Sequence, residues 1–189
     1  MLSTYLRTHP ANSALARAAA IVLFAALTAL TARITVPLPF TPVPITLQVM
    51  IVLLAGLTLG AKDGALSQMA YVATIAAGLP VDANGLGAAA FASPTAGYLI
   101  GFIAGAFVAG YLAERGLNRN RVLRLIAGLV GVSVIYFSGT AWLTTMFLGG
   151  DWAKGWALGV APFIVIDVIK ALLASATAEG ARLWVNRSK

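Results

Sequence analysis

The chain contains no cysteine and a single histidine, His9, among its 189 residues. The missing cysteine excludes disulfides, thiolate zinc sites and cysteine nucleophiles together. With one histidine and no HExxH motif, most metalloprotease sites and a serine–histidine intramembrane protease are excluded as well. The sequence also has no GxxxxGK[ST] phosphate-binding loop, so we expect that this chain does not itself hydrolyse ATP.

Charged residues are also scarce, at 10% of the chain, whereas 60% of the residues are hydrophobic and the mean hydropathy is +0.89. Soluble domains carry roughly 25% charged and about 45–50% apolar residues, so the composition predicts an integral membrane protein. The apolar residues suffice for about six spanning helices, with little left for a soluble domain. The net charge of +7 would suggest nucleic-acid binding in a soluble protein, but in a membrane protein basic residues usually lie in the cytoplasmic loops. We therefore expect no nucleic-acid partner.

Six apolar stretches predict an all-α fold with six transmembrane helices, in a single membrane domain over residues 1–189. The predicted spans are Ala14–Ile34, Ile45–Ala61, Gly64–Leu79, Pro94–Ala113, Leu125–Leu148 and Ala157–Val185. The segment between the last two, Gly149–Trp156, is expected to be a short loop. No cleavable signal is expected, because the first apolar run is already as long as a span.

The basic residues fall mainly on one side of this six-span arrangement. That side holds Arg7, Arg17, Lys62, Arg115, Arg119, Arg121, Arg124, Arg182, Arg187 and Lys189. Only Arg33 and Lys154 lie near the other side, and Lys170 lies within a span. Because basic residues collect in cytoplasmic loops, the asymmetry predicts that the N and C termini are both cytoplasmic.

Two of the predicted outer loops have unusual compositions. Residues Thr35–Thr46 place prolines at positions 37, 39, 42 and 44. This spacing blocks helix formation and favours a stiff, extended cover. Residues Pro80–Ser93 are rich in glycine and alanine, so their backbone can approach a ligand closely, although a plain flexible connector has the same composition.

Asp167 and Lys170 are the strongest functional signal, because a charge near the bilayer centre costs at least about 2.5–3.5 kcal/mol on insertion scales. Phe163, Asp167, Lys170 and Ala174 are predicted to form one inward-facing strip of a helix. The pair is either a structural ion pair that neutralises itself or a polar binding site for a small molecule. Pro162 removes a backbone bond to residue 158, which kinks the helix or frees a carbonyl.

Other residues give weaker signals. Asn84 lies in the glycine-rich loop beside Asp82, where its carboxamide offers a ligand a donor and an acceptor, although Asn before Gly is also a turn signal. Small residues indicate where helices approach closely. An alanine line runs along the first span at Ala14, Ala18, Ala25, Ala29 and Ala32, and GxxxG spacing links Gly56 with Gly60 and Gly97 with Gly101 and Gly105.

Several separated motifs occur in one order over nearly the whole chain. They are VPLPFTPVPITLQ at 36–48, GLPV at 78–81, SPTAGYLIGF at 93–102 and the DVIK of the last span. Together they resemble the BioY family, the biotin-specific substrate-binding (S) components of energy-coupling factor (ECF) transporters. The resemblance implies a six-helix bundle in the inner (plasma) membrane, with a biotin site that opens to the outside under the loop between the first two helices.

The resemblance also implies partners and site residues. The partners would be biotin, membrane lipid, a transmembrane coupling (T) subunit and two cytoplasmic ABC-type ATPases that use ATP, with no cofactor in this chain. Asp167, Lys170 and Asn84 would contact biotin, and Ala25 and Ala29 of the first helix would contact the coupling subunit. One departure is Asp82, which follows GLPV where family members often have an apolar or aromatic residue.

Biotin suits these side chains chemically. A carboxylate such as Asp167 can accept from the ureido N–H groups, and Lys170 can donate to a carbonyl or pair with the carboxylate of the valerate tail. The expected function is therefore biotin capture for ATP-driven uptake by partner subunits. The alternatives are a solitary secondary transporter or facilitator, an S component for another vitamin, and an intramembrane enzyme, which the residues support poorly.

Overall fold

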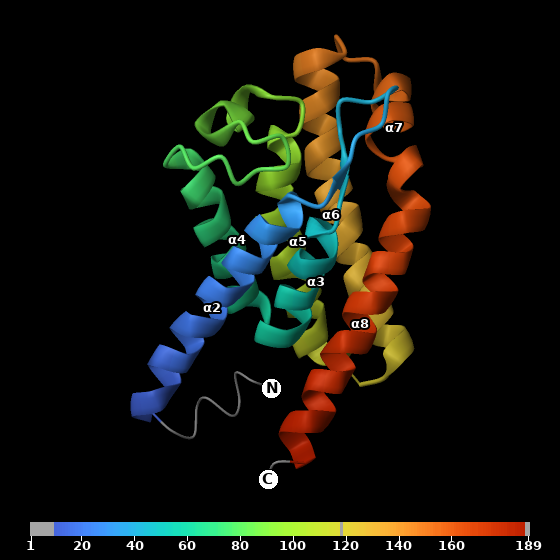
Figure 1. Cartoon of the computed structure of the whole chain (residues 1–189). Coiled ribbons are helices and arrows are strands. Elements are labelled where there is room, and N and C mark those ends of the chain that lie inside the picture. Colours follow the sequence, from blue (N-terminus) through green and yellow to red (C-terminus); the bar gives the residue numbers. More distant parts are fainter. Residues whose placement is uncertain (1–9, 118, 188–189) are drawn as a thin grey trace.

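The computed structural model describes residues 10–117 and 119–187 (Figure 1). Arg7, His9 and Lys189, named above, lie outside the described residues. The elements in chain order are α2(Pro10–Ala32), β1(Thr35–Val36), β2(Ile45–Thr46), α3(Gln48–Leu59), α4(Ala61–Ala76), η1(Gly87–Ala92), α5(Ala96–Leu112), η2(Ala113–Leu117), α6(Arg121–Phe147), α7(Trp152–Gly159), η3(Ala161–Phe163) and α8(Ile164–Arg187).

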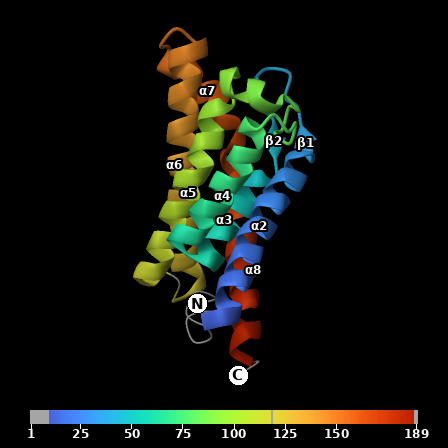
Figure 2. The same cartoon turned by 90° about the vertical axis from the view of Figure 1, so that its left-hand side faces the viewer.

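The long helices lie side by side as a bundle, with α2 leaning away from the others at its N-terminal end (Figures 1 and 2). The first residues of α2 and the last residues of α8 lie at the same end of the bundle. We call this the terminal end, and we call the other the loop end, because the segments after α2 and α4 and the short helix α7 lie there (Figure 1).

Among the described residues, four helical stretches are long and apolar enough to cross a bilayer. They are Ala14–Ala32, Ala96–Leu117, Arg121–Phe147 and Trp152–Gly180. Helix α3 is apolar but has only 12 residues, and α4 has 16. At 1.5 Å per residue these two are about 18 and 24 Å long, less than the roughly 30 Å of hydrocarbon in a bilayer.

Helices α3 and α4 form a hairpin with a single residue, Gly60, between them. Gly60 has φ of 89°, a left-handed conformation that favours glycine. The two helices then pack so closely that a Cβ on Gly64 would lie 2.8 Å from the Cα of Gly56. The prediction of a helix over Ile45–Ala61 was wrong at its start, since Ile45 and Thr46 form strand β2 and the helix begins at Gln48.

The predicted span over Ala157–Val185 is interrupted near its start, where Pro162 was expected to kink the helix or free a carbonyl. The helix breaks after Gly159, passes through the short η3 turn and resumes at Ile164. Pro162 lies inside the break, as its missing N–H requires. The expected loop at 149–156 is largely helical, because α7 begins at Trp152 with the Asp151 carboxylate accepting from the backbone N–H of Lys154 at 3.0 Å. This contact lowers the pKa of Asp151.

The GxxxG glycines of α5 serve packing inside the bundle. A Cβ on Gly97 would lie 2.6 Å from the carbonyl oxygen of Ser138, and one on Gly101 would lie 3.1 Å from the Cα of Ile135. Helices α5 and α6 therefore approach each other backbone to backbone. In the same way, a Cβ on Gly56 would lie 2.3 Å from the carbonyl oxygen of Ala106, which fixes α3 against α5.

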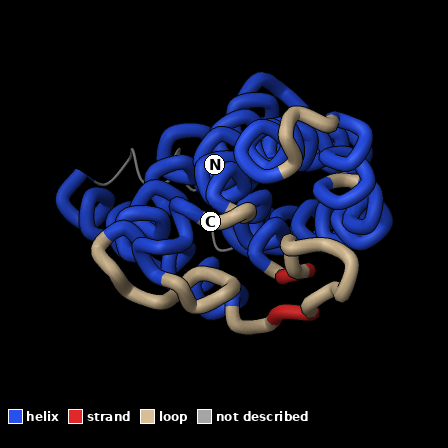
Figure 3. Tube along the Cα trace, turned by 90° about the horizontal axis from the view of Figure 1, so that it is seen from above, coloured by secondary structure: helices blue, strands red, loops and turns tan. Residues whose placement is uncertain are grey.

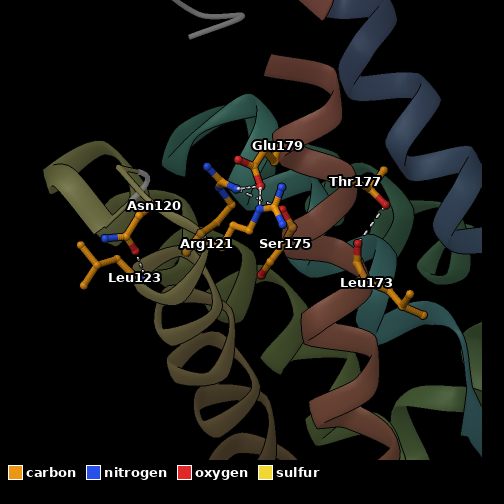
Figure 4. Close-up of polar contacts among 8 residues, drawn as sticks. Asn120, Arg121, Leu123, Leu173, Ser175, Thr177 and Glu179 are labelled. Atoms are coloured by element: carbon orange, nitrogen blue, oxygen red, sulfur yellow. Dashed lines mark hydrogen bonds and ion pairs between the residues drawn. The ribbon is translucent and has the colours of Figure 1, made fainter. Parts of the chain in front are cut away.

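Ion pairs join the helices at the terminal end. Arg121 at the start of α6 donates to Glu179 of α8 at 2.7 Å (Figure 4), and Arg17 of α2 makes a two-pronged contact with Asp63 of α4. The α5–α6 connection is held by Glu114, whose carboxylate accepts from the backbone N–H of Ala61 at 3.1 Å.

Candidate ligand-binding site

A cavity of about 600 Å³, counting the space at its open mouth, lies between the loop after α2 and helices α3, α5, α6 and α8. Its lining residues are Val43, Pro44, Ile45, Thr46, Gln48, Val49, Asp82, Ala83, Thr95, Tyr98, Leu99, Phe102, Ile135, Tyr136, Phe163, Asp167 and Lys170. Aliphatic and aromatic groups make up most of this wall, and a few polar groups converge on it. Small-molecule sites have this composition.

Asp167 and Lys170 form a buried ion pair in the cavity wall. The Lys170 ammonium donates to Asp167 Oδ1 at 2.6 Å, and the two residues are only 3% and 4% exposed. Phe163 and Ala174 are buried as well, so the predicted inward-facing strip is confirmed. The first residues of α8 place the pair at the loop-end half of the bundle, just after the break at η3.

Tyr136 of α6 contacts the ion pair from the neighbouring helix. Its hydroxyl donates to Asp167 Oδ2 at 2.7 Å, so each carboxylate oxygen already has one partner. An ionised carboxylate has about four acceptor sites and an ammonium has three donors, so about two acceptor sites and two donors remain for a ligand. The pair can therefore bind a group that carries both N–H and C=O without first separating.

Further polar groups of the cavity wall come from the start of α3 and from the loop after α4. Gln48 donates to the hydroxyl of Tyr71 at 2.7 Å, and that hydroxyl donates in turn to the carbonyl of Val81 at 3.2 Å. Asp82 is 2% exposed, and its two oxygens accept from the backbone N–H groups of Asn84 at 3.0 Å and Gly87 at 2.8 Å. The acidic departure from the family motif therefore organises the loop after α4.

The third predicted ligand residue, Asn84, is not brought together with the pair. Its side chain is exposed and does not line the cavity, although its neighbours Asp82 and Ala83 do. The sequence "Asn-Gly" here forms a turn, in which the Gly85 N–H donates to the Asp82 carbonyl at 3.1 Å. The turn reading of this pattern fits the structure, and a contact between Asn84 and a ligand stays a prediction.

The two alanines predicted to contact a partner face the bundle itself. Ala25 is 9% exposed and belongs to the core around the cavity, and Ala29 packs against the same core. The alanines of this line differ in exposure, since Ala14 and Ala18 are exposed where α2 leans away from the bundle. In this structure Ala25 is almost fully covered and Ala29 is partly exposed, and their contact with a partner stays a prediction.

Sequence reasoning missed Tyr136 as a site residue. A tyrosine in an apolar span signals a hydroxyl that needs a partner. The sequence does not say which helix supplies that partner, and here it is α8, 31 residues further along the chain. At the same end of the bundle, the guanidinium of the exposed Arg33 donates to the carbonyl of Pro80 and joins the end of α2 to the loop after α4.

Comparison with known proteins assigns the family. The sequence model described as "BioY family" matches residues 6–187 of the chain. This chain belongs to the BioY family. A biotin transporter BioY from Rhizobium etli is 43% identical over 148 residues, which cover 74% of this chain and 78% of the relative. A probable biotin transporter BioY from Pyrococcus horikoshii is 44% identical over 160 residues, with coverages of 84% and 91%.

A solved structure shares the fold of this BioY member. It is the crystal structure at 2.1 Å of the S-component for biotin from an ECF-type ABC transporter. The two superpose with a TM-score of 0.79 at 30% identity, and the match covers 91% of this chain and 93% of the other. The all-helical membrane fold and the family predicted from the sequence motifs are thereby confirmed.

Proposed function

We propose that this chain captures biotin at the membrane, as the S component of an ECF-type uptake transporter. The observation that carries the proposal is the buried Asp167–Lys170 pair in the wall of an otherwise apolar cavity, in a chain of the BioY family. The protein is a multi-pass protein of the plasma membrane that transports its ligand and does not transform it chemically.

Each part of biotin finds a complementary group in the cavity. Asp167 accepts from the ureido N–H groups, and Lys170 donates to the ureido carbonyl or to the carboxylate of the valerate tail. The aliphatic wall, with Leu99, Phe102 and Ile135, packs against the sulfur-containing ring. Asn84 would join these contacts only if the loop after α4 moved its exposed side chain toward the mouth.

The proposed topology has six spans with both termini in the cytoplasm. The first half of α2, the α3–α4 turn and the connection from α5 to the first residue of α6 lie at the terminal end, and they carry Arg17, Lys62, Arg115, Arg119 and Arg121. By the positive-inside rule we assign that end to the cytoplasm. The cavity lies toward the opposite end, so it opens outward. The short helices α3 and α4 complete their spans with irregular backbone, which is tolerated at membrane depth where it lines a cavity.

Release of biotin on the inside would depend on partners. We propose a transmembrane coupling subunit and two ATPases, which use ATP that this chain has no loop to bind. Uptake that persists in cells lacking these subunits and that follows a proton or sodium gradient would instead identify a solitary transporter.

The test is a binding titration of the purified protein with labelled biotin in the absence of ATP. We expect tight binding, and we expect Asp167→Asn or Lys170→Ala to weaken it more than Gln68→Ala. Gln68 is a matched control because it is fully buried and polar but does not line the cavity. Unchanged affinity in both site variants would remove the site assignment, and displacement by riboflavin or thiamine would point to another vitamin.

A further inference from the structure

The loop between α2 and α3 crosses the loop end of the bundle and reaches α7 (Figure 1). Its base is the antiparallel pair β1–β2, in which Val36 faces Ile45. The eight residues between the strands, 37–44, contain all four prolines of this region, so the segment is stiff between its base and its tip. We call residues 37–44 the strap. Figure 3 shows the two short strands and the loop that joins them at one side of the bundle.

One side chain attaches the strap to the bundle by a hydrogen bond. The Thr41 hydroxyl donates to the carbonyl of Leu158 in α7 at 2.7 Å, and Thr41 is 8% exposed. The same hydroxyl accepts from the backbone N–H of Val43 at 3.2 Å. Val43 lines the cavity, so a single hydroxyl connects a residue of the cavity wall to the last turn of α7.

The acceptor for this bond exists because the helix breaks at this point. In a continuous helix the carbonyl of Leu158 would accept from the N–H of residue 162, but residue 162 is proline and has no N–H. The next carbonyl, that of Gly159, is released by the same break, since the Phe163 N–H donates instead to Val160 at 3.0 Å.

The second released carbonyl also holds a residue of the cavity. The Tyr98 hydroxyl donates to Gly159 at 2.8 Å, and Tyr98 lines the cavity from α5. Two neighbouring carbonyls released by one break therefore anchor two different walls of the cavity. Because a buried carbonyl without a donor is costly, the break and its two donors stabilise each other.

We propose that Thr41 is a latch that holds the strap over the cavity, and that Pro162 supplies the carbonyl to which it binds. Thr41 is thus a positioning residue that sets how fast ligand leaves, a proposal that rests on the proposed capture of biotin. Opening the strap breaks the Thr41–Leu158 hydrogen bond while the β1–β2 base stays paired. Thr41 does not line the cavity, so its loss acts on release rather than on the contacts with ligand.

The first experiment measures the dissociation rate of labelled biotin from the full chain in detergent. We expect Thr41→Val, which keeps the branched shape and removes the hydroxyl, to release biotin about fivefold to tenfold faster. Thr41→Ser keeps the hydroxyl and should release at the wild-type rate. A wild-type rate in Thr41→Val would overturn the proposal, as would equally fast release from both variants.

A second variant tests the origin of the acceptor. Pro162→Ala restores an N–H that competes with Thr41 for the Leu158 carbonyl, so it should also speed release while leaving Thr41 in place. If both act on one bond, the double variant Thr41→Val/Pro162→Ala should be no faster than the faster single variant. Independent, multiplicative effects would contradict a shared bond.

A third measurement needs no biotin. The natural chain has no cysteine, so Leu99→Cys places a single thiol in the cavity wall behind the strap. Adding Thr41→Val should raise its rate of labelling by a small thiol reagent about fivefold to tenfold, and Thr41→Ser should not. If Thr41→Val speeds labelling but the protein does not bind biotin, the proposed function is wrong and the latch is supported. If the protein binds biotin but Thr41→Val leaves the labelling rate unchanged, only the latch is wrong.

Discussion

Replacing the buried ion pair with a neutral pair separates its two possible roles. The change is Asp167→Asn together with Lys170→Met, which nearly keeps both shapes and removes both charges. The amide oxygen of the introduced asparagine would still accept from the Tyr136 hydroxyl, which lies 2.7 Å from Asp167 Oδ2. If the pair only neutralises itself, this exchange is neutral or stabilises the fold by about 1–4 kcal/mol, and ligand binding is unchanged.

Binding should respond in the opposite direction. Hydrogen bonds to charged groups contribute about 1.5–3 kcal/mol each, and the pair has donors and acceptors free for at least one bond from each residue. The asparagine amide recovers about 1 kcal/mol of this as a neutral bond, which leaves a net loss of roughly 2–5 kcal/mol. That loss corresponds to biotin binding about 30- to 5,000-fold more weakly.

The assay pairs a biotin titration with thermal unfolding of the same purified sample. We expect an unchanged or higher unfolding temperature without biotin, and a loss of the stabilisation that biotin gives the wild type. Wild-type affinity in the neutral variant would refute the reasoning, because the two charges would then serve only each other. A drop in both stability and affinity would show that the pair stabilises the fold in this membrane setting, and the single variants would then be needed to assign binding.

Three further variants test neighbouring features. Tyr136→Phe removes the hydroxyl that positions Asp167 and should weaken biotin binding about tenfold in a titration, whereas unchanged binding would mean that the ring only fills space. Gly101→Leu should force α5 and α6 apart and cost about 1–3 kcal/mol in unfolding, while Gly180→Ala, which meets no neighbour within 4 Å, should not destabilise the protein. Asp82→Ala frees two backbone N–H groups, so hydrogen exchange should accelerate at Asn84 and Gly87 and stay slow in α5; equal protection in both proteins would contradict its role in holding the loop.

The fold class was accessible from the sequence because hydropathy is a local and additive property. The six apolar runs and the concentration of basic residues on one side could be identified without knowing how the helices pack. The inward strip from Phe163 to Ala174 was equally readable, since helical periodicity puts these positions on one face. The errors lie at the ends of helices. At Ile45, for example, the apolar run predicted helix, but the residue pairs with Val36 in a short strand instead.

By itself, the sequence determined that this is a helical membrane protein with an acid and a base facing inward, and its motifs indicated the BioY family. The tertiary structure decided which groups meet across helices: Tyr136 on Asp167, Thr41 on the carbonyl freed by Pro162, and Ala25 against the core. The reason is physical, because apolar periodicity places a residue on a face, whereas the partner of a hydroxyl or a carbonyl depends on how separate helices pack.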